Sequence, residues 1–242
     1  MDLVLITGSQ GKVGFELAKY LKESGFEVQP ILHDSIYSEY FLPSSSNMLD
    51  YDSIFIVHSG QPNAPRSRLQ RKRYLSATKN LIEESKIRKI KFVYISSLSA
   101  HSSNRSNYAR DKLYLEGLTI HNSGTVIKLG LVTGVVGSYT SRILHIKRIL
   151  SLIRLDFLIT SAPTYYTPVN SLSEVSVILQ SRDSWGGVKG IFQGTAQTQA
   201  DLGYFRESVR NIVIFMLFSF TKLGFGSADA FLSLIDGMEV PE

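Results

Sequence analysis

The sequence has no cysteine among its 242 residues. This absence excludes disulfide bonds, thiolate-bound metals and a cysteine nucleophile, and we assign no metal site. It also fits a reducing compartment. The chain begins with an apolar strand and lacks a basic and then apolar leader, so no signal peptide is predicted and we expect a cytoplasmic protein.

Long apolar runs are also missing. The longest uncharged apolar segment is 212–221, which is much shorter than the roughly 20 residues that a helix needs to cross a bilayer. No transmembrane segment is therefore predicted. We expect 212–221 to be a buried helix or a subunit contact, with contact to a membrane surface as the alternative.

Acidic residues are fewer than basic ones, since 21 Asp and Glu against 26 Lys and Arg give a net charge of +5. Much of the excess lies in one cluster, formed by Arg66, Arg68, Arg71, Lys72 and Arg73. A basic cluster is one sign of a nucleic-acid patch, but no aromatic residues for base stacking are interleaved with this one. The cluster opens a predicted helix, so we interpret it as a solvated helix face and predict no nucleic-acid binding.

What the sequence does contain is a regular alternation of apolar β-rich segments and helical patterns. With 43% hydrophobic and 19% charged residues, the chain has an ordinary globular balance and is long enough for one domain with a sizeable core. The alternation predicts an α/β fold with a doubly wound parallel sheet covered on both faces. The expected strands are 3–7, 27–32, 53–58, 91–96, 125–129 and 190–193, and the expected helices lie near 12–24, 67–86, 108–120, 138–153, 171–181 and 199–210.

A glycine-rich turn follows the first predicted strand directly. Gly8, Gly11 and Gly14 have the three-then-three spacing of a nucleotide-binding turn. The first glycine allows the tight bend, the second lets the backbone approach a pyrophosphate, and the third lets the helix pack close to the strand. The free N–H groups and the dipole at the helix start favour an anion there. A plain tight turn between strand and helix is the alternative interpretation.

A second motif follows the fourth predicted strand. Tyr108 and Lys112 are four residues apart, so they share one face of a helix. A cation beside a phenol lowers the pKa of that phenol. Ser97 stands at the end of the strand, where its hydroxyl can hold a substrate oxygen beside the phenol. Ligands of parallel sheets bind outside the carboxyl ends of the strands, so Gly8, His58 and Ser97 are expected to meet at one crevice.

Together, the two motifs resemble those of the extended short-chain dehydrogenase/reductase family, in its NAD-dependent epimerase/dehydratase branch. That branch begins with Thr-Gly-x-x-Gly-x-x-Gly and carries Ser (or Thr) and Tyr-x-x-x-Lys. Later segments are similar to further landmarks of the branch in the expected order, and the resemblance covers residues 1 to about 205. These segments are 52–60, 78–83, 126–134, 166–173 and 190–194.

The resemblance implies a Rossmann-type NAD(P)-binding domain over residues 1–160, whose last strand returns near 190–194. Residues 161–242 would form a small substrate-binding lobe that is not independent. The lobe is abbreviated, because family members are usually longer by several dozen residues. In many relatives the helices that correspond to 67–86 and to the segment from Tyr108 form a dimer bundle, which implies a homodimer here.

The resemblance also implies the roles of the site residues. Tyr108 exchanges a proton with the substrate, Lys112 lowers the pKa of the phenol and holds the nicotinamide ribose, and Ser97 hydrogen-bonds the substrate oxygen. Ser96 and Ser99 are rival candidates for the hydroxyl, although strand alternation points Ser96 and Ser97 to opposite faces. His58 is expected to be a wall of the cofactor pocket. The implied cofactor-binding residues are Gly8, Ser9, Gln10, Gly11, Lys12, Val13, Gly14, His33, Asp34, His58, Ser59, Gly60, Tyr108 and Lys112.

Departures from the family pattern concern the choice between NAD and NADP. The acidic residue that holds the ribose hydroxyls of NAD should fall near Leu32, whose side chain cannot do so. A basic residue at this end of the site, such as Lys12 in the turn, can meet the 2′-phosphate of NADP, so we favour NADP over NAD. Asp34 on the ribose is the competing interpretation, and a solvated loop is the plain one. Asn170-Ser171 also replaces paired acids, so we expect a looser cap on the cofactor site.

The function implied by the resemblance is that of an NAD(P)-dependent sugar-nucleotide epimerase or keto-sugar reductase. Dehydration is disfavoured, because Leu98 and Ser99 stand where a dehydratase usually has acidic residues. The alternative is a sensor or scaffold that binds NADP without turnover. The short lobe and the missing paired acids favour this alternative, and the intact trio of Ser97, Tyr108 and Lys112 opposes it.

Overall fold

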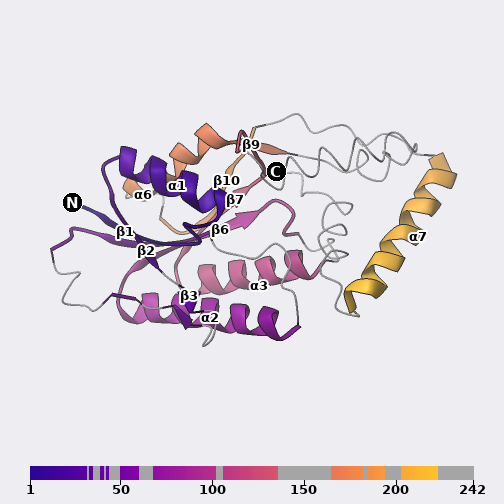
Figure 1. Ribbon diagram of the computed structural model, residues 1–242, viewed down its shortest axis with the longest axis horizontal. Helices are drawn as coiled ribbons and strands as arrows, with labels where there is room; N and C mark the ends of the chain where they lie inside the picture. Colours follow the sequence, from indigo (N-terminus) through magenta and orange to yellow (C-terminus); the bar gives the residue numbers. More distant parts are fainter. Residues whose placement is uncertain are drawn as a thin grey trace.

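A parallel sheet of six strands forms the centre of the molecule (Figure 1). The computed structural model describes residues 1–31, 33–34, 39–40, 42–43, 50–59, 68–101, 106–135, 165–181, 185–193 and 203–222. In spatial order the strands are β10 (Gly187–Ile191), β7 (Thr125–Leu129), β6 (Lys91–Ser97), β5 (Ile54–His58), β1 (Leu3–Thr7) and β2 (Glu27–Ile31), and all neighbours run parallel.

Two pairs of helices cover the two faces of this sheet (Figure 1). One face is covered by α1 (Lys12–Glu23) and α6 (Glu174–Gln180), and the other by α2 (Arg68–Ile87) and α3 (Asn107–His121). The side chains of β6 alternate accordingly, with Ile95 in the core under α1 and α6, and Tyr94 in the core under α2 and α3. The predicted α/β fold with a doubly wound parallel sheet is therefore confirmed.

The carboxyl ends of the central strands lie at one edge of the sheet. Thr7 of β1 is level with His58 of β5 and Tyr94 of β6, and Ser97 is level with Leu129 of β7. From β1 the chain moves first to β2 on one side and then to β5 on the other, so the order of strands reverses at β1. Sheets of this type bind their ligands at that reversal.

The two outer strands have unusual residues for a sheet. β2 carries Pro30 opposite Ile6, and Pro30 is exposed. A proline has no backbone N–H to donate to a further strand, so it is tolerated at an edge. β10 begins at Gly187, and both Gly186 and Gly187 have positive φ angles, of 91° and 75°.

Several predicted boundaries differ from the structure. The strand expected at 190–193 begins earlier, because Gly186 and Gly187 make the bend and the strand follows at once. The helix expected at 171–181 is divided into a 3-10 turn, η2 (Val169–Ser173), and α6, where the chain packs against α1. The expected helix 138–153 lies outside the described residues. Short strands that were not predicted are β3 (His33–Asp34), β4 (Glu39–Tyr40), β8 (Leu131–Thr133) and β9 (Tyr166–Pro168).

The apolar segment 212–221 belongs to α7 (Gly203–Lys222), which continues well beyond the helix expected at 199–210. Figure 1 shows α7 set apart from the sheet and its covering helices. Phe215 is 69% exposed whereas Ile214 is 2% exposed, so the expectation of a buried helix is wrong for one side of α7. The subunit contact, and the division of the chain at residue 160, stay predictions.

Candidate functional site

The glycine turn has the geometry that its spacing predicts. Gly8 has a φ of 70°, a left-handed conformation that favours glycine. The N–H of Gly11 donates to the Gly8 carbonyl at 2.8 Å, and Gly11 is the N-cap of α1. A Cβ at Gly14 would overlap the Gly8 carbonyl and would lie 2.7 Å from Oγ of Ser59. The turn therefore brings the start of α1 against the ends of β1 and β5, as a site for a pyrophosphate requires.

The other cofactor candidates lie around this turn as far as the structure describes them. Ser9, Val13 and Ser59 are half-buried, and Gln10 and Lys12 are exposed. Oγ of Ser59 donates to the Thr7 carbonyl at 2.7 Å, which fixes the end of β5 to the end of β1. The backbone of His33 and Asp34 forms β3, paired with β4, while their side chains, Leu32 and Gly60 lie outside the described residues.

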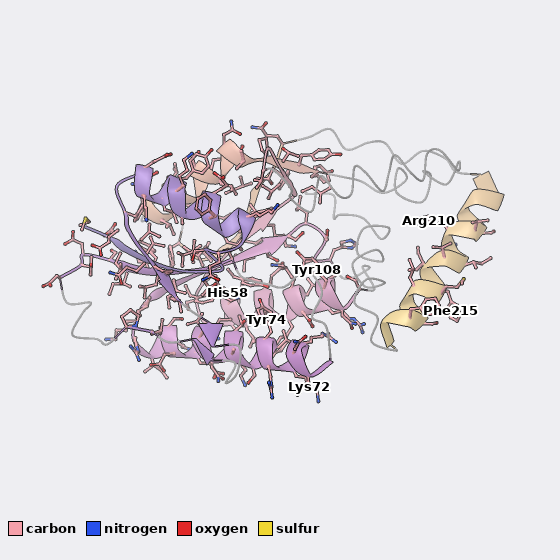
Figure 2. The ribbon with its side chains drawn as sticks, viewed as in Figure 1. His58, Lys72, Tyr74, Tyr108, Arg210 and Phe215 are labelled. Atoms are coloured by element: carbon pink, nitrogen blue, oxygen red, sulfur yellow. The ribbon has the colours of Figure 1, made fainter. Side chains whose placement is uncertain are left out.

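Helix α3 places Tyr108 and Lys112 at its first two turns. Ser106 caps the helix, because its Oγ accepts a hydrogen bond from the Ala109 N–H at 3.0 Å. Tyr108 is half-buried and Lys112 is buried, and Nζ of Lys112 lies 5.7 Å from the centre of the Tyr108 ring. Figure 2 shows Tyr108 on α3, on the same side of the sheet as His58 and Tyr74.

The side chain of Lys112 points inward to β6. It is 5% exposed, Nζ donates to the Ile95 carbonyl at 2.8 Å, and the ammonium lies 4.8 Å from the centre of the Tyr94 ring. Burial lowers the pKa of Lys112 to about 7, and the charge of Glu116 acts in the opposite direction. An ammonium group is thus held between two phenol rings in a poorly solvated place.

The two serines at the end of β6 have different surroundings. The Ser96 hydroxyl donates to Glu116 of α3. Ser97 is half-buried, and its Oγ accepts a hydrogen bond from the Ser99 N–H at 3.2 Å. Ser96 is therefore committed to the packing of α3 on the sheet, while Ser97 stands at the carboxyl edge. The role of Ser97 in catalysis stays a prediction.

His58 lies inside the protein at the end of β5. Its Nδ1 is 2.8 Å from Oγ1 of Thr7, and its Nε2 is 3.0 Å from the hydroxyl of Tyr74. The imidazole ring stacks on the Tyr94 ring at a centroid distance of 5.7 Å, and His58 is fully buried. Burial raises the pKa of Tyr94 well above its ordinary value, so this phenol stays neutral. The expectation that His58 walls the cofactor pocket stays a prediction.

Two buried acids of α3, Asp111 and Glu116, are not among the predicted site residues. Glu116 accepts from Ser96 and lies 3.6 Å from Nζ of Lys128, and Asp111 pairs with Arg71 of α2. The four-residue spacing of Tyr108 and Lys112 continues to Glu116, and that continuation was the available signal. Asp111 gave no such signal, because its partner is forty positions earlier in the chain.

The basic cluster at the start of α2 has mixed surroundings. Arg71 is held by Asp111, while Lys72 and Arg73 are exposed, and Figure 2 shows Lys72 on the outer side of α2.

Across the described ranges, no group of His, Cys, Asp or Glu is arranged to hold a metal ion. Among the same residues, no helix has the length and apolar character needed to cross a membrane.

No protein-family model matches this sequence, and no curated protein matches it in sequence.

Several solved structures share the fold over most of the chain. A nucleoside-diphosphate-sugar epimerase from Staphylococcus aureus superposes with a TM-score of 0.64 at 12% identity, covering 100% of this chain and 93% of that one. UDP-N-acetylglucosamine 4-epimerase from Bacillus cereus gives 0.59 at 16% identity, with 98% and 97% covered. A human epimerase family protein solved with NADPH gives 0.59 at 14% identity, with 98% and 90% covered. The chain therefore shares the Rossmann-type fold of these proteins, which is the fold that the resemblance predicts.

Proposed function

We propose that this chain is an NAD(P)-dependent sugar-nucleotide epimerase or keto-sugar reductase. The observation that carries the proposal is the placement of Tyr108 and Lys112, whose side chains lie together on α3 with Nζ 5.7 Å from the phenol ring. Two solved structures of similar fold are nucleotide-sugar epimerases, and a third contains NADPH. The cysteine-free sequence supports a cytoplasmic location.

The glycine turn fits a dinucleotide. Gly8 and Gly11 place no side chain over the backbone of the turn, and the first turn of α1 presents N–H groups that the helix itself does not use. Lys12 is exposed at this place, which supports NADP as the preferred form. When bound, the nicotinamide supplies the hydride chemistry of the reaction.

The residues of α3 and β6 would handle the proton. The phenol of Tyr108 takes a proton from a sugar hydroxyl, or returns one to a ketone. The ammonium of Lys112 favours the phenolate and holds a ribose hydroxyl with a donor that is not used for the Ile95 carbonyl. The hydroxyl of Ser97 orients the same sugar oxygen.

A sensor or scaffold that binds NADP without turnover is the second candidate. Nζ of Lys112 donates to the Ile95 carbonyl and Oγ of Ser97 accepts from the Ser99 N–H, contacts that are compatible with this candidate although both groups keep further donors. In addition, Asn170 and Ser171 in η2 have no carboxylate for the cofactor cap, and Ser171 is buried. The two candidates make the same prediction for cofactor binding and opposite ones for turnover.

A substrate panel distinguishes these candidates. The protein is incubated with NAD(P)(H) and with UDP-, GDP- and dTDP-sugars, and nicotinamide absorbance and sugar products are followed. We expect turnover of at least one sugar, reduced about 10²- to 10⁴-fold by Tyr108→Phe. Tyr114→Phe is the matched control, since Tyr114 lies on the same helix and is 49% exposed. NADPH binding without turnover of any sugar would favour the sensor, and full activity of Tyr108→Phe would exclude the assigned site.

We further propose a homodimer in which α2 and α3 of two copies pack together. Leu69 of α2 and Tyr114 and Ile120 of α3 are large apolar side chains exposed on these helices, which supports the contact. Light scattering at micromolar concentration tests it, and a monomeric mass would contradict it.

A further inference from the structure

Glu116 extends the face of α3 that carries the proposed site. It follows Tyr108 and Lys112 at the same four-residue spacing, so the three side chains lie on one side of the helix. Lys112 is 5% exposed and Glu116 is 6% exposed. An ammonium group and a carboxyl group are thus buried one helical turn apart, where low solvation strengthens their mutual attraction.

The carboxyl group of Glu116 is held by two neighbouring strands. The Ser96 hydroxyl of β6 donates to its Oε1, and Nζ of Lys128 of β7 lies 3.6 Å from its Oε2. Ser96 and Lys128 are direct partners in the pairing of β6 with β7. Glu116 therefore fastens α3 to the sheet immediately before the end of β6.

Lys128 extends this connection to the turn that begins at Ser97. Its Nζ also donates to the Ala100 carbonyl at 3.2 Å, and the Ala100 N–H donates to the Ser97 carbonyl at 2.9 Å. A continuous path of charged and polar contacts thus joins Glu116 to the backbone of Ser97. Its members come from α3, β7 and the loop after β6.

We propose that Glu116 is a positioning residue for the site, which favours the ammonium form of Lys112 and ties the turn at Ser97 to α3. The inference rests on the proposed function for the roles of Lys112 and Ser97. The effect of Glu116 on the protonation of Lys112 is a property of the free protein, so it can be measured without a substrate.

The groups around Lys112 show why Glu116 is suited to this task. Tyr108 of α3, Tyr94 of β6, Tyr74 of α2 and His58 of β5 carry no carboxylate, and Lys128 of β7 is a second cation. The charge of Asp111 is compensated by Arg71. Among the described residues packed here, Glu116 is therefore the anion available to stabilise the ammonium of Lys112.

The direction of the pKa shifts agrees with this geometry. Burial is the main cause of the low pKa of Lys112, about 7, and Glu116 is the group that raises it. Burial also raises the pKa of Glu116, and the Ser96 hydrogen bond and the charges of Lys128 and Lys112 counteract this effect. Removing the charge of Glu116 would remove the effect that counteracts burial, so the pKa of Lys112 would fall further.

A titration of the free protein tests the inference. The Nζ signal of Lys112 is followed by NMR against pH and is assigned by its loss in Lys112→Arg. In Glu116→Gln we expect the midpoint of Lys112 to fall by about one pH unit or more, because an opposite charge has been removed. Glu116→Asp withdraws the carboxylate by one methylene, so a smaller fall is expected. Glu83→Gln is the control, since Glu83 forms an exposed pair with Lys79 and should leave Lys112 unchanged.

An unchanged Lys112 midpoint in Glu116→Gln would overturn the inference. Should that variant fail to fold, Glu116→Asp decides, and a midpoint equal to that of the wild type would overturn the inference in the same way. In turnover assays, Glu116→Gln should move the loss of kcat at high pH to a lower pH, an effect that a merely structural role does not produce. Absence of turnover in the wild type would remove the proposed function and leave the NMR result standing.

Discussion

Arg71 and Asp111 join α2 to α3 through two parallel hydrogen bonds. Nε of Arg71 donates to Oδ2 of Asp111 at 2.6 Å, and Nη2 donates to Oδ1 at 2.5 Å. The Asp111 side chain is 5% exposed and that of Arg71 is 28% exposed. A two-pronged contact of this kind combines charge with fixed geometry. It holds together the two helices that cover the site side of the sheet.

Loss of this pair should destabilise the fold. In Asp111→Ala the guanidinium loses its partner, and we expect the free energy of unfolding to fall by about 2–3 kcal/mol. This is just below the range of about 3–5 kcal/mol for breaking a fully buried pair, since Arg71 reaches solvent. Urea denaturation measures the change. Glu83→Ala, which breaks the exposed pair with Lys79, should cost less than about 0.5 kcal/mol. Equal costs for the two variants would show that the Arg71 contact contributes no more than a surface pair.

Replacement by alanine should have opposite effects on stability at two glycines that lie within helices. In Gly14→Ala the new methyl group meets the Gly8 carbonyl, which is backbone and cannot move aside, so we expect a destabilised turn and loss of NADPH binding. In Gly117→Ala the methyl group meets nothing within 4 Å, and the variant should be more stable by about 0.5–1 kcal/mol. Denaturation curves and NADPH titrations of both variants test these two predictions. Normal NADPH binding by Gly14→Ala would contradict the prediction for the glycine turn.

Lys112 should make stability depend on pH. Its pKa is about 7 in the folded protein against an ordinary value of 10.5, so between these values the unfolded chain holds a proton that the folded protein has released. The penalty for burying Lys112 is present in full below pH 7 and is relieved as the pH rises towards 10.5. Relative to Lys112→Met, the wild type should therefore gain up to about 1.4 kcal/mol per pH unit in this window.

Urea denaturation of both proteins at several pH values measures this gain. Lys86→Met, at an exposed position of α2, is the control and should show no such trend against the wild type. A constant difference between the wild type and Lys112→Met at all pH values would mean that Lys112 keeps an ordinary pKa after folding.

Lys12 should decide between the two dinucleotides. In Lys12→Ala we expect NADPH to bind about tenfold more weakly, as the loss of one charge-assisted hydrogen bond predicts, while NADH binding stays the same. Fluorescence titration with both cofactors is the measurement, and Lys19→Ala, an exposed lysine of the same helix, is the control. Tighter binding of NADH than of NADPH by the wild type would end the preference for NADP.

Local sequence patterns were sufficient to predict the centre of the fold. The glycine turn and the strands at 3–7 and 125–129 agree with the structure, because apolar runs and glycine spacing act within a few residues. The start of β10 differs from the predicted one, since the strand begins at Gly187, and glycine is depleted in strands.

The contacts of the site were harder to predict. The sequence indicated that Tyr108 and Lys112 share a helix face, and the structure has them on α3. It did not indicate that Nζ of Lys112 bonds the Ile95 carbonyl, or that Arg71 reaches Asp111. These contacts depend on how α2 and α3 pack against β6. The spacing of residues within one helix does not predict this packing.

Pro30 has a consequence for how copies of this protein meet. An outer strand normally offers a row of N–H and carbonyl groups on which another chain can align, and a proline interrupts that row. At the opposite border, β10 contains Lys189 and two glycines in its five residues, a composition that pairs poorly with a neighbour. Growth of the sheet from molecule to molecule is thereby discouraged on both sides, and among the described residues the helices offer the better surface for association.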